Sequence, residues 1–447
     1  SRECINLAIG VVAENADLLG RLAELQLAAG QLDDALKSAE SAIKLDDDHM
    51  RARMVQARVQ VESGDLETAD TSFRWFVRYY NRKQPEDAES LLMVGEGAVE
   101  YARWHSVSSI FNFIVNTLCP DALKDEPDSW QAHFVSGSRL LEKYNRAEAL
   151  PDLEKALTIN PRAVEVIVKL GEAALQQHDI SKGAVYAKQA LAVRPKSVLA
   201  LQLQADVLLM KHDVNGSLEA LKQARQVNPV DQGTLGRLAA CYYLLDAQRD
   251  VEAAEERVNH LFANLDAIDE GIPDSPTRLE ELIIEVARRN PKPGHFLTTF
   301  GEGLETRRKF SMAEKAYQQA MRVMPQLSAP KTQLGMLYMQ TGRSKEAEQM
   351  LDEAFNADPY HVRVSNMRKV LGVLSKYETI TTDHFVIRVD AATDRVLGEY
   401  LAEYLEEVYT ELVTLYDFEP PHRTTFEIYH NAKGLSAHQW FSARMVG

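Results

Sequence analysis

Three histidines near the C-terminal end come nearest, by residue type and spacing, to a metal site. His422, His430 and His438 recur every eight residues around an expected strand. A catalytic zinc takes three protein ligands and keeps one open position. His430 ends the expected strand and His438 belongs to a separate segment, so the spacing alone does not bring the three imidazoles together. We expect no bound metal and no cofactor in this chain.

Other reactive residue types fall into patterns that a structural role explains. Cys4, Cys119 and Cys241 are too far apart for a disulfide framework or a ligand set, so we expect buried, small apolar side chains. Gly95–Gly97 and Gly301–Gly303 read Gly-Glu-Gly but lack the third glycine and the preceding strand of a phosphate-binding loop. No catalytic constellation is apparent before residue 377.

The elements that position these residues follow a period of 34 residues. Ala149, Ala156 and Pro161 recur 34 residues later as Gly183, Ala190 and Pro195. Small residues allow two helix axes to approach closely, and proline ends a helix. The period predicts first helices that start at residues 16, 50, 88, 130, 164, 198, 232, 294 and 328.

This pattern resembles the tetratricopeptide repeat, a helix–turn–helix unit of 34 residues. Gly30, Gly64 and Gly342 occupy its turn, where a left-handed residue is favoured. The units that start at 88 and 232 deviate, since Val107 and Val251 replace the small residue. The resemblance implies an all-α, right-handed α–α superhelix of about nine repeats, in which each helix pair packs on its neighbours.

In such an array the first helices line the concave face, where side chains at fixed positions point inward. Acidic residues recur there, and no repeat has the lysine and asparagine pair that some tetratricopeptide proteins use for acidic tails. We therefore expect a mildly acidic groove for a basic or apolar segment, although a merely solvated inner face remains an equal alternative. The candidate peptide-binding residues are Glu24, Arg58, Phe134, Glu172, Gln202, Asp206, Tyr243 and Glu302.

The pattern changes after residue 376. His384–Asp390 alternates like a strand, Asp394–Tyr416 has helical apolar periodicity, and Thr425–Tyr429 reads as a second strand. These features resemble the start of a gluzincin-type zinc metallopeptidase domain. That family holds zinc on a His-Glu-x-x-His helix, and no such motif occurs in the sequence. The resemblance implies a partial α+β segment, with zinc only in a longer chain.

Charge and composition limit the classes of partner. The formal net charge of −16 argues against nucleic acid, because phosphate binding needs a basic surface. No run of about 18 apolar residues predicts a membrane span. The expected organisation is a first repeat block at 1–265, a loop and inserted helix at 266–293, a second block with a capping helix at 294–376, and the α+β segment at 377–447.

Two functions are compatible with this organisation. The first is a scaffold that binds protein or peptide segments on the concave face. The second is the substrate-recognition arm of a zinc metallopeptidase whose catalytic helix lies outside this sequence. The chain itself carries no catalytic motif, and its compartment and oligomeric state cannot be derived from the pattern.

Overall fold

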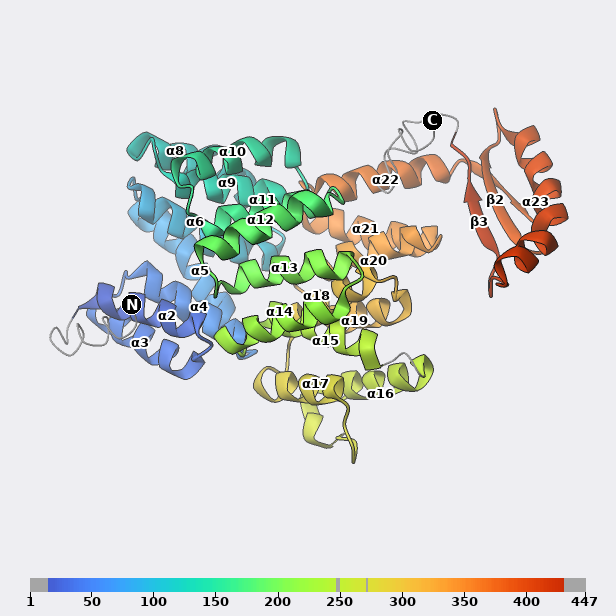
Figure 1. Cartoon of the computed structure of the whole chain (residues 1–447). Coiled ribbons are helices and arrows are strands. Elements are labelled where there is room, and N and C mark those ends of the chain that lie inside the picture. The colour runs from blue at the N-terminus through green and yellow to red at the C-terminus, as the bar shows by residue number, and fades with distance from the viewer. Residues whose placement is uncertain (1–14, 247–249, 271, 430–447) are drawn as a thin grey trace. The chain divides into compact units, whose positions relative to one another are not determined.

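The computed structural model describes residues 15–246, 250–270 and 272–429. Cys4, His430 and His438 lie outside this range. The chain forms two compact units, residues 1–334 and 335–447, which are described separately (Figure 1). The domain boundaries expected from the sequence stay a prediction.

The first unit is an array of antiparallel helix pairs. Its first helices start at the residues that the 34-residue period predicts, and small residues such as Ala149, Ala156 and Ala190 are fully buried between helices. These first helices are α2 (Ala16–Ala28), α4 (Met50–Glu62), α6 (Ala88–His105), α9 (Trp130–Glu142), α11 (Val164–Leu175) and α13 (Val198–Met210). Their partners include α3 (Leu32–Leu45), α5 (Leu66–Lys83), α10 (Arg146–Ile159), α12 (Ile180–Val193) and α14 (Val214–Val227).

The partner of α6 is not one regular helix. It consists of α7 (Ser109–Phe113), a π-helical turn η1 (Ile114–Leu118) and α8 (Cys119–Asp125). Pro120 lacks the N–H group that an α-helix would need there, and a wider turn accommodates the missing bond. This irregularity explains why the sequence of the repeat deviates. Cys119 and Cys241 are buried free thiols with raised pKa values, as expected for structural cysteines.

The repeat expected from residue 232 is not an ordinary helix pair. α15 (Gln232–Asp246) packs along α18 (Gly294–Thr306) rather than along α16 (Val251–Ala263), to which a side-chain hydrogen bond joins it. Helix α16 packs against α17 (Arg278–Arg289) and α19 (Phe310–Val323). The backbones of α15 and α18 approach so closely that a Cβ atom on Gly236 would lie 2.6 Å from the carbonyl oxygen of Phe296. The residues inserted between α15 and α18 thus change which helices pair. Two further helices of the array are α19 (Phe310–Val323) and α20 (Ala329–Gln340), and α20 spans the boundary of the units.

The insertion itself contains a 3₁₀ segment η2 (Leu265–Glu270) and α17 (Arg278–Arg289). Helix α17 is capped by Thr277, whose hydroxyl accepts from the backbone N–H of Glu280 while the Glu280 carboxylate accepts from that of Thr277. This reciprocal pair satisfies two free donors at once.

Repeats that are far apart in sequence contact each other within the first unit. Asn228, after α14, donates from Nδ2 to the Leu27 carbonyl at 3.4 Å, and Asn290, after α17, donates to the Val61 carbonyl at 3.2 Å. Each asparagine sits over a turn glycine with positive φ, Gly30 or Gly64. We call these two equivalent contacts the closure. It joins the first two repeats to helices about 200 residues further along the chain.

The second unit contains α21 (Ser344–Ala357), α22 (Val362–Leu374) and a three-stranded sheet. Strand β1 (Tyr377–Thr381) pairs antiparallel with β2 (Phe385–Asp390), which pairs parallel with β3 (Thr424–Glu427). Helix α23 (Arg395–Tyr416) connects β2 and β3 and packs on β1 and β2. The strand–helix–strand order matches the sequence prediction, whereas β1 was not predicted.

The expected fold class, a helical-repeat superhelix followed by a small α+β segment, is confirmed. Among the described helices, none has the length and apolar character needed to cross a lipid bilayer.

Candidate binding groove

A hollow of about 480 Å³ opens on the first-helix face of the repeat array. Its lining comes from α6, α9 and α11, which are successive first helices, so it lies on the face that the repeat architecture makes concave. Charged and apolar groups share this lining, and the residues are Glu96, Arg103, Phe134, Val135, Ser138, Arg139, Leu141, Glu142, Lys169, Glu172 and Gln176.

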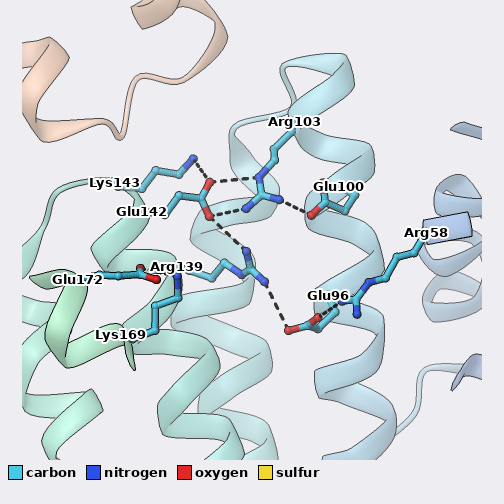
Figure 2. Close-up of polar contacts among 9 residues, drawn as sticks. All are labelled: Arg58, Glu96, Glu100, Arg103, Arg139, Glu142, Lys143, Lys169 and Glu172. Carbon is cyan, nitrogen blue, oxygen red and sulfur yellow. Dashed lines mark hydrogen bonds and ion pairs between the residues drawn. The ribbon is translucent and has the colours of Figure 1, made fainter. Parts of the chain in front are cut away.

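An ion-pair network forms one wall of the hollow (Figure 2). Arg103, on α6, binds Glu100 of its own helix and both carboxylate oxygens of Glu142 on α9. Burial alone would raise the pKa of Glu142, but Arg103, Lys143 and Arg139 outweigh burial and hold that pKa well below its usual range. Glu142 therefore stays ionised and fixes α6 against α9.

Arg139 belongs to the same network but is held less firmly. Its guanidinium lies 3.2 Å from a Glu142 oxygen and 3.5 Å from a Glu96 oxygen, and its Nε has no hydrogen-bond partner. The Oγ atom of Ser138 and the Oε1 atom of Gln176, both in the lining, are also buried without a partner. Buried polar atoms are normally hydrogen-bonded, so these three atoms mark a place where polar contacts are missing.

Apolar side chains complete the hollow. Phe134, a predicted site residue, lines it and lies 6.2 Å from the ring of Trp130, centroid to centroid. Glu172, also predicted, lines the opposite wall and accepts a 2.6 Å hydrogen bond from Lys169. The structure thus brings these two predicted residues to one cavity.

A second group of predicted residues gathers around Arg237 of α15. Asp206 binds Arg237 through two hydrogen bonds of 2.8 and 2.9 Å. Burial alone would lower the pKa of Arg237, but Asp206, Glu302 and Glu172 together raise it. Burial raises the pKa of Glu302, although Gln333 donates to it at 3.1 Å. Of the three predicted acids from α11, α13 and α18, Asp206 binds Arg237 directly, whereas Glu302 and Glu172 act on its pKa without a direct contact.

The remaining predicted residues are occupied by internal contacts. Glu24 binds Arg51, and Arg58 binds Glu96 at 3.0 Å. The buried amide of Gln202 donates to Asp231 and Thr234. Tyr243 is only 1% exposed and its hydroxyl donates to Glu255. It lies in the core and presents no ring surface to a ligand, so it does not enter the functional proposal.

The charge balance of the groove differs from the sequence expectation. Glu24, Glu172 and Asp206 each face a cation, namely Arg51, Lys169 and Arg237. These acids share the ninth position of their repeats, whereas Arg51 is at the second position and Lys169 and Arg237 are at the sixth. The groove is therefore paired in charge rather than acidic.

Over the described part of the chain, no group of three histidine, cysteine, aspartate or glutamate side chains has the arrangement of a metal site. Of the histidine trio, only His422 lies in that part.

Two segments match the tetratricopeptide repeat family, residues 21–69 and residues 331–361. The chain therefore carries tetratricopeptide repeats at both ends of the helical array, as the 34-residue period predicted. The comparisons give no support to the resemblance between the C-terminal segment and metallopeptidases, and no curated protein matches the sequence.

Several solved structures share the helical-repeat architecture. The APC/C hetero-tetramer Cut9–Hcn1 is 14% identical with a TM-score of 0.44, and the match covers 83% of this chain and 58% of that one. YrrB, a TPR protein with an unusual peptide-binding site, is 19% identical with a TM-score of 0.24 (45% and 97% covered). The human IFIT1 dimer with PPP-AAAA is 19% identical with a TM-score of 0.40 (84% and 87% covered). Likenesses this distant carry no argument about function.

Proposed function

We propose that this protein is an interaction scaffold that binds an extended segment of a partner protein at the hollow formed by α6, α9 and α11. The observation that carries the proposal is the coincidence of this hollow with three buried polar atoms that lack partners, on Ser138, Arg139 and Gln176. Tetratricopeptide proteins bind protein or peptide partners, so this function also suits the fold.

A peptide main chain offers hydrogen-bond partners for these three atoms. Its carbonyl groups accept hydrogen bonds, as Arg139 Nε requires, and its N–H groups donate them, as Gln176 Oε1 requires. Phe134 provides apolar surface for a side chain of the bound segment. Because the acids of the groove are paired with cations, we expect a segment of mixed charge rather than a strongly basic one.

Binding requires a small rearrangement, since the three polar atoms are screened from solvent. Arg139 is the residue that can move, because its two ion-pair contacts are long. Arg103 and Lys143 still neutralise Glu142 when Arg139 turns away. The network can therefore release one guanidinium to a ligand without leaving a buried carboxylate unpaired.

The test is selection of peptides from a random phage-displayed library on the whole protein, followed by affinity measurement. Arg139→Gln should weaken the selected peptides at least tenfold without changing the melting temperature by more than a few degrees. Arg194→Gln, which removes an exposed arginine at the C-cap of the outer helix α12, is the matched control and should bind normally. Crosslinks of the peptides to α10 or α12 instead of α6, α9 and α11 would contradict the proposal.

The peptidase-arm alternative rests on one observation, the β2–α23–β3 order that its resemblance implies. Elemental analysis for zinc and an assay with unfolded casein test it directly. We expect less than stoichiometric zinc and no hydrolysis, whereas stoichiometric zinc would favour the alternative. That the chain does not bind nucleic acid also stays a prediction, and a filter-binding assay with single-stranded RNA checks it.

A further inference from the structure

Exposed apolar side chains concentrate on one short stretch of the second unit. Of the sixteen large apolar side chains that are exposed in the described residues, nine lie between residues 396 and 426. We call those on α23 the α23 patch: Val396, Leu397, Tyr400, Tyr404, Leu412, Leu415 and Tyr416. Scattered exposed apolar residues are ordinary, but a contiguous group of this kind marks an interaction site.

Val396, Tyr400 and Tyr404 of the patch lie on a different side of α23 from the face that packs on the sheet. Leu401, Leu405 and Tyr409 join Phe385 and Ile387 in the core of this unit. Val396, Tyr400 and Tyr404 follow one another at intervals of four residues, so they line a separate side of the helix. The sequence predicted a single apolar face for the helix in Asp394–Tyr416. The structure divides its apolar residues between a buried side and an exposed side.

Individual exposures show how little covers the patch. Val396 is 80% exposed, Tyr400 64% and Leu415 70%. The Tyr400 and Tyr404 rings stack almost parallel, with their centroids 6.3 Å apart. Two tyrosines in a fixed arrangement form a preorganised contact surface, and tyrosine is among the residues that dominate binding energies at interfaces.

Phe426 extends this open surface onto the sheet. It is 39% exposed on edge strand β3, and its ring contacts Phe385 at 5.8 Å between centroids. Because α23 packs on β1 and β2, it leaves the side of β3 that bears Phe426 partly uncovered.

Charge identifies the kind of partner. Helix α23 contains five glutamates and a single arginine. Glu406 is bound by His384 and Glu399 by Arg395. Glu403, Glu407 and Glu411 follow one another at intervals of four residues beside Tyr400 and Tyr404, and like charges at this spacing repel each other. A partner with lysine or arginine beside its apolar residues would relieve that repulsion.

We propose that the α23 patch is the docking surface for an amphipathic, basic helix of another protein. The partner's apolar side covers Val396, Tyr400 and Tyr404, and its cations face Glu403, Glu407 and Glu411. A second copy of this chain is the wrong occupant, because two copies of α23 would place these glutamate rows against each other.

The experiment uses the whole protein and a fluorescent helical peptide of leucine and lysine with a 3.6-residue apolar period. The peptide should bind, and the double variant Tyr400→Ser, Tyr404→Ser should weaken binding at least tenfold. Val185→Ser is the matched control, since Val185 is equally exposed on α12 at 64%. Replacing Glu403, Glu407 and Glu411 with glutamine should reduce the salt dependence of binding.

Three outcomes would overturn the proposal. The first is equal binding of a leucine–glutamate peptide. The second is a concentration-dependent dimer in sedimentation that the tyrosine variant abolishes, because a second copy would then be the occupant. The third is protection of Tyr400 and Tyr404 from nitration in the free protein, because the chain would then cover its own patch. A melting temperature unchanged in every variant excludes loss of folding as the explanation.

Discussion

At the scale of single residues, pairing decides what the groove offers a ligand. The sequence identified Glu172, Asp206 and Glu302 as inward-facing acids, and the structure groups them with Arg237. The partner of each acid could not be derived, because that partner lies on another helix or at a different position of the same helix. The residue type at one repeat position therefore indicates that a side chain lies in the groove. It does not indicate the net charge of the groove, because that charge depends on the partners.

Glu62 illustrates the effect of such a contact on pH dependence. It lies beside the closure, where Gln232 donates to it at 3.0 Å. Burial, with a contribution from nearby Asp231, raises its pKa from 4.5 to about 7, although Gln232 and Arg289 act in the opposite direction. The folded state thus holds a proton that the unfolded state releases, and stability should fall as pH rises from about 5 to about 7.

Glu62→Gln should remove this pH dependence because glutamine resembles the protonated acid. We expect similar free energies of unfolding for variant and wild type at pH 5, and a variant more stable by about 1–3 kcal/mol at pH 8. Urea unfolding at both pH values is the measurement. Glu67→Gln, at an exposed glutamate of α5, should leave the profile unchanged, and a parallel decline in the Glu62 variant would contradict the assignment.

At the scale of elements, helix starts were predictable and helix partners were not. The small residues at fixed spacing located α2, α4, α9, α11 and α13, because close helix crossings require them. The pairing of α15 with α18 depends on a three-dimensional contact between helices that are separated by 47 residues, 247–293, and no periodicity encodes such a contact. Strand β1 was not predicted, although Tyr377–Thr381 contains three β-branched residues.

Gly236→Ala tests the pairing of α15 with α18. The added Cβ would lie 2.6 Å from the Phe296 carbonyl oxygen and 3.0 Å from the Phe300 nitrogen, both backbone atoms. We expect a loss of about 1–3 kcal/mol, as for other overpacked positions. Gly233→Ala in the same helix meets only side chains, the nearest at 3.2 Å. It should be neutral or slightly stabilising, and equal losses in chemical denaturation would exclude this pairing.

At the scale of the first unit, the closure connects distant repeats. Its two contacts are built alike, from an asparagine after one helix and a glycine in an earlier turn. The turn glycines were recognised in the sequence as helix ends, and Asn228 and Asn290 precede Pro229 and Pro291. Their meeting was not predictable, because it depends on the pitch of the superhelix, which the repeat period does not encode.

Gly30→Ala should weaken the closure beyond the usual cost of losing a left-handed glycine. Gly30 has φ +73°, and an added Cβ would lie 2.5 Å from Asn228 Oδ1. Gly342→Ala is the matched control, since Gly342 has φ +74° but its nearest neighbour would be 3.5 Å away. Both variants should lose about 1–2 kcal/mol from backbone strain, and Gly30→Ala should lose clearly more in urea unfolding. Identical losses would show that the closure contributes nothing.

The closure also bears on how this unit folds. An open repeat array behaves as a nearly one-dimensional chain, in which any repeat nucleates and its neighbours follow. Contacts between residues 27 and 228, and between 61 and 290, couple the first two repeats to segments about 200 residues further along the chain. Folding must then overcome the unfavourable entropy of closing a loop of about 200 residues. It should therefore be slower than in an open array. In return, the terminal repeats no longer fray independently, and the first unit loses its structure in one cooperative step.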